Sequence, residues 1–254
     1  MAQIRATITD HLKQLRLPAI RECFEEYADM ARRETCSYEQ YLLELVQQEY
    51  QERRENRIRR YLNQSNLPPD KTIGTFDTKR LPTGVIHQVK TLLDGRFIDR
   101  CENLLVFGKP GTGKTHLVSA IGRELINQGR RVYFASTSLI VQDMLIAKRD
   151  LKLKRLLKKF SRFDAIILDD LGYVQQNREE MEVLFTLLAE RYERGSTILT
   201  SNLPFSQWEK IFKDPMTTAA AIDRLVHHSI ILELNIPSYR MEAADKGKNE
   251  NSDE

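Results

Sequence analysis

The sequence predicts an α/β fold in which helices flank a parallel sheet, preceded by a small all-helical region. Three observations support this prediction. An apolar run is followed at once by a glycine-rich loop and a helical pattern, between residues 103 and 121. Beyond it, strand-like and helix-like segments alternate, as they do in parallel sheets with crossover helices. Residues 1–62, in contrast, contain no glycine and only one proline, Pro18, a composition that favours helix.

Three helices are expected in the N-terminal region. Apolar residues from Ile4 to Leu15 recur at helical spacing, and a second helix should run from Pro18 to Arg33. Ser37, with Gln40 three residues later, predicts a capping box that opens the third. This helix ends in arginines and glutamates between residues 53 and 60. A solvated face with ion pairs is the favoured interpretation, and contact with DNA phosphates is the alternative.

A linker is expected between residues 63 and 84, because serine, proline and glycine interrupt the helical pattern there. We therefore place a domain boundary near residue 70. Residues 1–70 would form a helical domain for DNA or partner interaction, and residues 71–240 an α/β domain. The small, polar and acidic residues 241–254 are expected to be a disordered tail.

The α/β domain should contain five strands. The first is the apolar run Leu104 to Phe107, and four more are expected at residues 131–135, 164–168, 197–201 and 229–234. A helix between the third and fourth is predicted by the cap pair Asn177 and Glu180, and Gly195 ends it.

The loop after the first strand has the spacing of a phosphate-binding loop (P-loop), Gly-x4-Gly-Lys-Thr. Its glycines let backbone N–H groups surround a polyphosphate, and the following helix adds its positive dipole end. Lys114 would reach the β- and γ-phosphates of ATP, and the Thr115 hydroxyl would bind Mg²⁺. The expected nucleotide-binding residues here are Gly108, Lys109, Pro110, Gly111, Thr112, Gly113, Lys114, Thr115 and His116. Adenine contacts are first to be sought around Thr75 and Phe76.

Polar residues follow two of the later strands. Asp169 and Asp170 come directly after the third strand, where the first acid would hold Mg²⁺ and the second would polarise the attacking water. Asn202 follows the fourth strand, and its amide could hydrogen-bond the γ-phosphate or the water.

A basic segment between residues 148 and 162 holds eight cations against one acid, Asp150. Leucines and Phe160 at helical spacing would pack one face on the core. The remaining arc would contact DNA phosphates without reading bases, whereas a merely solvated helix would mix charge signs. The cations are Lys148, Arg149, Lys152, Lys154, Arg155, Lys158, Lys159 and Arg162.

Composition excludes several other classes. No apolar run approaches the roughly 18 residues of a membrane span, and the N-terminus has no secretion signal, so a cytoplasmic location without membrane attachment is expected. The three cysteines are widely separated and lack a metal-binding or disulfide pattern.

Five short segments together resemble the IstB family, the helper AAA+ ATPases of bacterial insertion sequences, which are similar to the helicase loaders DnaC and DnaI and to the initiator DnaA. The motifs are GKPGTGKTHL at 108–117, ILDDLGY at 167–173, RYERGSTILTSN at 191–202, and AIDRL at 221–225 with SYR at 238–240. The helical N-terminal part, with LRLP at 15–18, also resembles this family.

The resemblance implies an AAA+ ATPase that forms a homo-oligomer on double-stranded DNA, independently of DNA sequence, and recruits or activates the transposase of its element. It implies that Asn202 is a sensor, that Arg224 is an arginine finger reaching a neighbouring subunit, and that Arg240 is a second sensor arginine. In many AAA+ proteins a glutamate stands where this chain has Asp170. Because only 14 residues follow Arg240 in this sequence, a C-terminal helical lid domain is not expected.

Three alternatives stay open. A DnaC/DnaI-like replicative helicase loader would share the fold. A P-loop kinase for small molecules would need a mobile arginine-rich lid, which nothing in the sequence resembles. A nucleotide-gated binding protein with negligible turnover is compatible with the shorter side chain of Asp170.

Overall fold

The computed structural model describes residues 2–172, 177–208 and 215–239. By its contacts the chain divides into two compact units, residues 1–60 and 61–254. The expected domain boundary near residue 70 stays a prediction. Within the described ranges, no helix is long and apolar enough to cross a membrane.

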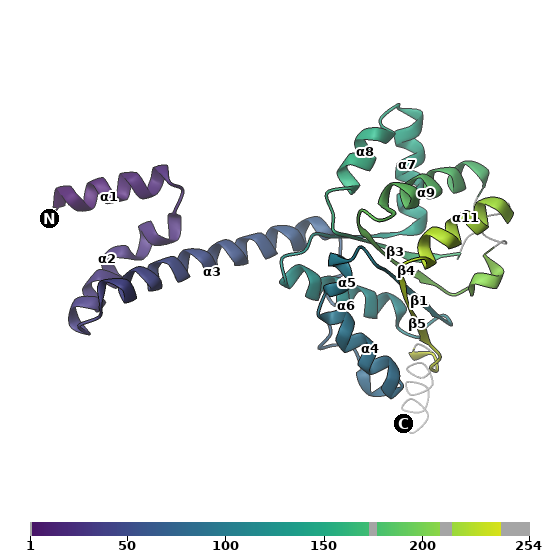
Figure 1. Cartoon of the computed structure of the whole chain (residues 1–254), viewed down its shortest axis with the longest axis horizontal. Helices are drawn as coiled ribbons and strands as arrows, with labels where there is room; N and C mark the ends of the chain where they lie inside the picture. Colours follow the sequence, from purple (N-terminus) through teal and green to yellow (C-terminus); the bar gives the residue numbers. More distant parts are fainter. Residues whose placement is uncertain (1, 173–176, 209–214, 240–254) are drawn as a thin grey trace, which may run out of the picture. The chain divides into compact units, whose positions relative to one another are not determined.

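The first unit contains α1 (Ala2–Gln14), α2 (Pro18–Arg33) and most of α3 (Tyr38–Ser65), as the composition predicted (Figure 1). The start of α2 is capped by α3, because the buried Glu49 carboxylate accepts the backbone N–H groups of Ala19 at 2.9 Å and Ile20 at 3.2 Å. These bonds satisfy donors that a helix start otherwise leaves unpaired. Ser37 and Gln40 exchange the two hydrogen bonds of the predicted capping box.

The apolar stripes of this unit are less buried than their spacing suggests. Leu45 and Phe24 are buried, but Leu15 is 67% exposed and Leu42 is 59% exposed. Helical spacing identifies an apolar face and does not determine whether the same chain covers it.

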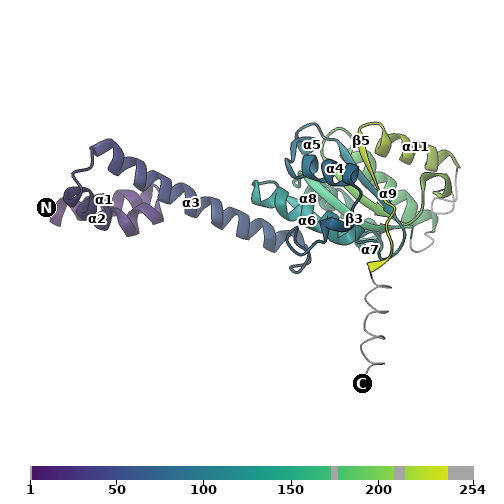
Figure 2. The same cartoon turned by 90° about the horizontal axis from the view of Figure 1, so that it is seen from below.

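The second unit is a five-stranded sheet between two helical layers (Figure 1). Its strands are β1 (Asn103–Gly108), β2 (Val132–Ser136), β3 (Ala165–Leu171), β4 (Ser196–Ser201) and β5 (Ser229–Leu234). One face is covered by α4 (Thr83–Leu93), α5 (Arg96–Asp99) and α6 (Lys114–Asn127), and Figure 2 views the unit from this side. The other face is covered by α7 (Thr137–Arg149), α8 (Leu153–Phe160), α9 (Arg178–Arg191) and α11 (Pro215–Val226). The described part of the unit also contains the short helices η1 (Thr78–Arg80) and η2 (Phe205–Gln207).

All five strands are parallel, in the order β2-β3-β4-β1-β5. The α/β class and the five strands expected from the sequence are therefore confirmed. Leu104 to Val106 in β1 and Ala165 to Leu168 in β3 are fully buried, as expected for strands covered on both faces. Because the strands run in one direction, their carboxyl ends share one edge of the sheet, where ligands bind in open α/β folds.

Two features differ from the sequence-based expectation. The expected linker contains the last turn of α3, the short helix η1 and the first turn of α4, which starts at Thr83. In addition, β3 continues to Leu171, so the two acids lie inside the strand and not after it. A bulge against β4 between Leu168 and Leu171 accommodates them.

Candidate nucleotide-binding site and basic surface

The P-loop, residues 108–115, connects β1 to α6 at the carboxyl edge of the sheet. Gly111 and Gly113 have φ of 81° and 88°, a left-handed conformation that glycine adopts without strain. A Cβ on Gly111 would lie 2.1 Å from the Ser238 hydroxyl oxygen, so a larger residue here would also displace that side chain. The predicted strand, loop and helix are therefore all present.

The Lys114 side chain is buried and folded onto the loop. Its ammonium group donates to the carbonyl oxygens of Gly108 at 2.8 Å and Lys109 at 3.0 Å. Hydrogen bonds to the backbone fix the position of this cation at the first turn of α6. Gly108 and Lys109 themselves do not line the cavity above the P-loop, which is described below.

Asp169 lies opposite the start of α6. Its carboxylate accepts from the hydroxyl groups of Thr115 at 3.1 Å and Thr200 at 2.6 Å. Burial raises the pKa of the Asp169 carboxyl, and the charge of Asp170 acts in the same direction, whereas the two hydroxyl groups and Lys71 lower it. The Thr115 hydroxyl and the Asp169 carboxylate are hard oxygen donors of the type that Mg²⁺ prefers, so this pair fits a magnesium ion.

Asp170 has a left-handed backbone, with φ of 59°, and an exposed side chain on the bulge of β3. Its backbone N–H donates to the Thr200 hydroxyl at 2.8 Å. The Thr200 hydroxyl thus accepts from the backbone N–H of Asp170 and donates to the carboxylate of Asp169. A strained conformation persists only where its surroundings hold it, and the hydrogen bond to Thr200 is one contact that can do so here.

A cavity of about 470 Å³ opens above the P-loop. Asp170 and Asn202 lie on its wall beside Lys114 and Thr115, so the structure brings these four predicted residues together. Pro110, Gly111, Thr112, Gly113 and His116 also line it.

The segment before η1 forms another wall of this cavity. Thr75 and Phe76, the residues expected near adenine, line the cavity. His116 holds this segment, because its Nε2 lies 3.2 Å from the Thr75 hydroxyl oxygen and 3.0 Å from the Thr72 carbonyl oxygen. The Phe76 ring packs edge-on against the His116 ring, with centroids 5.2 Å apart.

Several lining residues were not predicted from the sequence. Lys71 adds a second cation, and Arg80 lies over the Tyr239 ring at 5.3 Å. Residues of this kind carry no motif, and only the fold brings them to the P-loop. Ile236 and Tyr239 follow β5, and the Tyr239 N–H donates to the Gly111 carbonyl at 2.9 Å.

Arg224 is not among the described residues that line this cavity. Arg224 lies on α11, with its guanidinium 4.5 Å from the centre of the Phe185 ring. Its Nη1 is buried without a hydrogen-bond partner in the described part of the chain. Arg240 lies outside the described residues.

The basic segment comprises the end of α7, a turn at residues 150–152 and α8. As expected, Phe160 is buried in the core, and Leu153, Leu156 and Leu157 pack against it. Two of the cations form ion pairs, Lys148 with Glu182 at 2.9 Å and Lys152 with Asp150 at 3.1 Å. No carboxylate among the described residues pairs with the other six, which are Arg149, Lys154, Arg155, Lys158, Lys159 and Arg162.

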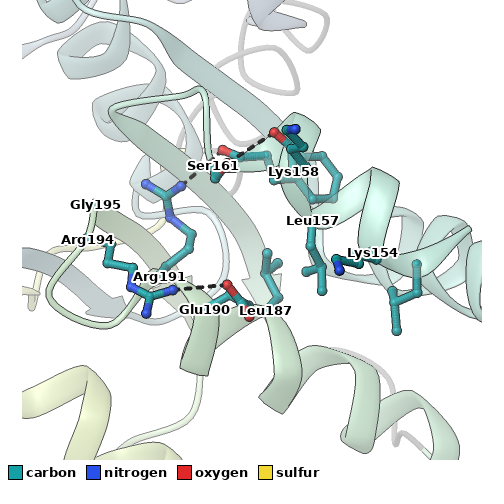
Figure 3. A pocket seen from close by; sticks show the side chains of 11 residues that line it. Lys154, Leu157, Lys158, Ser161, Leu187, Glu190, Arg191, Arg194 and Gly195 are labelled. Atoms are coloured by element: carbon teal, nitrogen blue, oxygen red, sulfur yellow. Dashed lines mark hydrogen bonds and ion pairs between the residues drawn. The ribbon is translucent and has the colours of Figure 1, made fainter.

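A largely apolar cavity of about 510 Å³ separates α8 from the end of α9 (Figure 3). Leu157 and Leu187 contribute to it from the two helices. At its margin Arg194 pairs with Glu190 at 3.3 Å.

Arg191 anchors α8 to the sheet, and the sequence did not reveal this role. Its guanidinium donates to the carbonyl oxygens of Phe160, Phe163, Asp164 and Ser196, at 2.8–3.2 Å. Burial lowers the pKa of Arg191 to about 10, so the group stays charged at neutral pH. The sequence around Arg191 only predicts a helix, and it does not indicate whether an arginine in that helix is buried or exposed.

The sequence profile of the family described as IstB-like ATP binding proteins matches residues 10–247. A Sinorhizobium fredii protein named as an insertion sequence ATP-binding protein is 42% identical over 238 residues, 93% of this chain and 80% of that protein. A Geobacillus stearothermophilus protein, named as the ATP-binding protein of insertion sequence IS5376, is 36% identical over 94% of this chain and 95% of its own length. Among solved structures, AMPPCP-bound DnaA from Aquifex aeolicus has a TM-score of 0.57 at 21% identity, over 74% of this chain and 56% of that chain.

Proposed function

The chain belongs to the family of IstB-like ATP binding proteins, and from this membership we propose that it is a transposition helper that hydrolyses ATP. In this proposal it assembles as a homo-oligomer on double-stranded DNA, independently of sequence, and recruits or activates the transposase of the same element. The names of its relatives support the insertion-sequence context.

One observation carries the enzymatic part of the proposal. Lys114, Thr115 and the exposed carboxylate of Asp170 line one cavity, and the buried Asp169 lies behind Thr115, hydrogen-bonded to its hydroxyl group. Its volume, about 470 Å³, is in the range of small-ligand sites. This combination of groups suits phosphoryl transfer, in which positioning and charge stabilisation provide most of the catalysis.

In the proposed reaction the P-loop N–H groups and Lys114 hold the β- and γ-phosphates of ATP. Mg²⁺, bound with ATP beside Thr115 and Asp169, would neutralise charge on the phosphate oxygens. Asp170 orients a water molecule and takes its proton as the water oxygen attacks the γ-phosphorus, and the bond to the β-phosphate oxygen breaks. Asn202 hydrogen-bonds the γ-phosphate or this water.

The same cavity offers a place for the base of the nucleotide. Phe76, Ile236 and Tyr239 supply apolar and aromatic surface beside the P-loop. Adenine is flat and apolar on its faces, so we expect it to lie against this wall.

The proposed DNA-binding surface is the exposed side of α8 and its flanking turns. Lys154, Arg155 and Lys158 are exposed and lack carboxylate partners in the described residues. Cations without protein partners are available to phosphates, and such contacts give binding that depends on salt and not on sequence.

The direct test is phosphate release with ATP, with and without duplex DNA and transposase. We expect release by the parent protein, stimulated by DNA or the partner, and none by an Asp169→Ala variant. If parent and Asp170→Glu are both silent with DNA and partner present, the chain binds nucleotide without turnover and the enzymatic proposal is wrong. Turnover that responds to a small acceptor and not to DNA would instead indicate a kinase.

The helicase loader is the second candidate. Capture of the purified transposase in the presence of ATP, without capture of the replicative helicase, is the expected result. The reverse result would assign the chain to helicase loading.

A further inference from the structure

A second polar cavity, of about 420 Å³, lies at the free edge of β2, away from the P-loop. Its cations come from two parts of the sequence. Lys159 and Arg162 belong to the basic segment, whereas Arg131 directly precedes β2. Amide and aromatic side chains complete the lining, namely Asn63, Gln64, Asn66, Tyr133 and Phe163.

None of the three cations is neutralised by a carboxylate in the described ranges, and no acidic side chain lines the cavity. The nearby Asp164 carboxylate accepts the backbone N–H of Arg131, at 2.7 Å, and not its guanidinium. The buried Nε of Arg131 has no hydrogen-bond partner among the residues described. A buried donor without a partner is costly, so it points to a ligand that supplies the acceptor.

Aromatic rings hold two of the cations in place. The Arg131 guanidinium lies 5.2 Å from the centre of the Tyr61 ring, and the Lys159 ammonium lies 5.8 Å from the centre of the Tyr133 ring. The Tyr133 ring is itself packed against Phe163, with centroids 5.2 Å apart. Cations held by ring faces keep their N–H groups free for an anion. The side-chain amides of residues 63, 64 and 66 can donate to the same anion.

We propose that this cavity is a phosphate-binding site, and that a backbone phosphate of bound DNA occupies it. The DNA part of this inference rests on the proposed function, whereas the recognition of a phosphate group does not. Three uncompensated cations with amide donors match a doubly or singly charged oxyanion better than a carboxylate-bearing peptide, because arginine and amide donors can share several oxygens of one phosphate. A site of this kind would fix the register of the DNA backbone against the edge of the sheet.

Arg131→Gln is the informative substitution, because Arg131 lies outside the basic segment and only this inference predicts that it affects DNA binding. Arg130→Gln is the matched control, since Arg130 pairs with Asp99 at 2.6 Å and does not line the cavity. Duplex binding is measured over a salt series, with the P-loop site saturated by a non-hydrolysable ATP analogue. We expect Arg131→Gln to flatten the slope of log affinity against log salt by about 0.9, the value for one lost phosphate contact, and Arg130→Gln to match the parent.

A second arm separates the possible sources of the phosphate and does not need DNA. Inorganic phosphate is titrated by calorimetry into the same analogue-saturated proteins. Heat of binding in the parent and in Arg130→Gln, but not in Arg131→Gln, would show a site for free phosphate or a free nucleotide. An effect of Arg131→Gln on duplex binding alone would assign the site to DNA.

Folding is controlled by the melting temperature and by Arg131→Lys, which keeps the charge and should recover most of the binding. If Arg131→Gln melts like the parent and matches it in salt slope and in phosphate titration, the inference is wrong. If the parent fails to bind DNA but binds phosphate through Arg131, the proposed function fails and the phosphate site stands.

Discussion

The cavity above the P-loop and the basic surface of α8 are both proposed to bind phosphates, but their charged side chains are held differently. In the cavity, Lys114 and Asp169 already have hydrogen-bond partners that fix their positions. On α8, cations such as Lys154 and Arg155 have no carboxylate partner among the described residues. Side chains held by hydrogen bonds act through their position, whereas cations without partners act through their charge. Substitutions in the cavity should therefore have large effects on ATP binding or turnover, and substitutions on α8 small additive effects on DNA binding.

The largest effect is expected for a residue outside both regions. In the proposed homo-oligomer Arg224 would reach the cavity of a neighbouring subunit, so Arg224→Ala should lower DNA-stimulated turnover by about 10³- to 10⁵-fold, the contribution of arginine fingers elsewhere. ATP binding by single subunits should persist, which an equilibrium titration with a fluorescent ATP analogue would show. Mixing with Lys114→Ala subunits should restore part of the turnover, and no rescue at any ratio would mean that the cavity is complete within one chain.

Lys114→Ala should weaken ATP binding on the order of 10- to 100-fold, because charged hydrogen bonds to the phosphates are lost. Lys109→Ala is the matched control, since Lys109 supplies a carbonyl oxygen to the loop and its side chain does not line the cavity. Isothermal titration with ATP measures both. Equal affinities for the two variants would locate the nucleotide elsewhere.

Thr200→Val should reduce turnover roughly 10-fold while ATP affinity changes little, because the hydroxyl that orients both acids is removed without a change in side-chain shape. Thr200→Ser retains the hydroxyl and should recover most of the rate. Steady-state phosphate release together with analogue binding makes the comparison. Unchanged turnover in Thr200→Val would show that Asp170 keeps its backbone conformation without this contact.

The smallest and most gradual effect is expected on α8. Successive replacement of Lys154, Arg155 and Lys158 by Ala should lower the salt slope of duplex binding by about 0.9 at each step, with ATP affinity unchanged. Lys90→Ala removes an exposed charge from α4, on the other face of the sheet, and should leave the slope intact. If one of these substitutions alone abolished DNA binding, α8 would contain a specific contact, and its cations would not act additively as proposed.

The sequence predicted those features that depend on local chemistry. The P-loop, the bounds of α2 and β5, and the apolar start of β3 follow from glycine spacing, a proline in the first helical turn and runs of apolar residues. The strand order and the bulge at Asp170 depend on contacts between distant segments, and no local pattern contains them. Thr200 illustrates the limit, because a threonine inside a buried strand gives no sign that its hydroxyl joins two acids.

The anchoring of α8 by Arg191 bears on how freely this surface could be redesigned. Among the described residues, the Arg191 side chain bonds only to carbonyl oxygens of the backbone, which every amino acid provides, so the anchor does not depend on the side chains of the helix that it holds. Gly195 is the exception, because a Cβ there would lie 2.6 Å from the Arg191 guanidinium. The exposed positions of α8 can therefore exchange charge, polarity or length of side chain while Arg191 and Gly195 keep the helix in place. The exposed residues of α8 can therefore be replaced while the Arg191 contacts to its backbone stay the same.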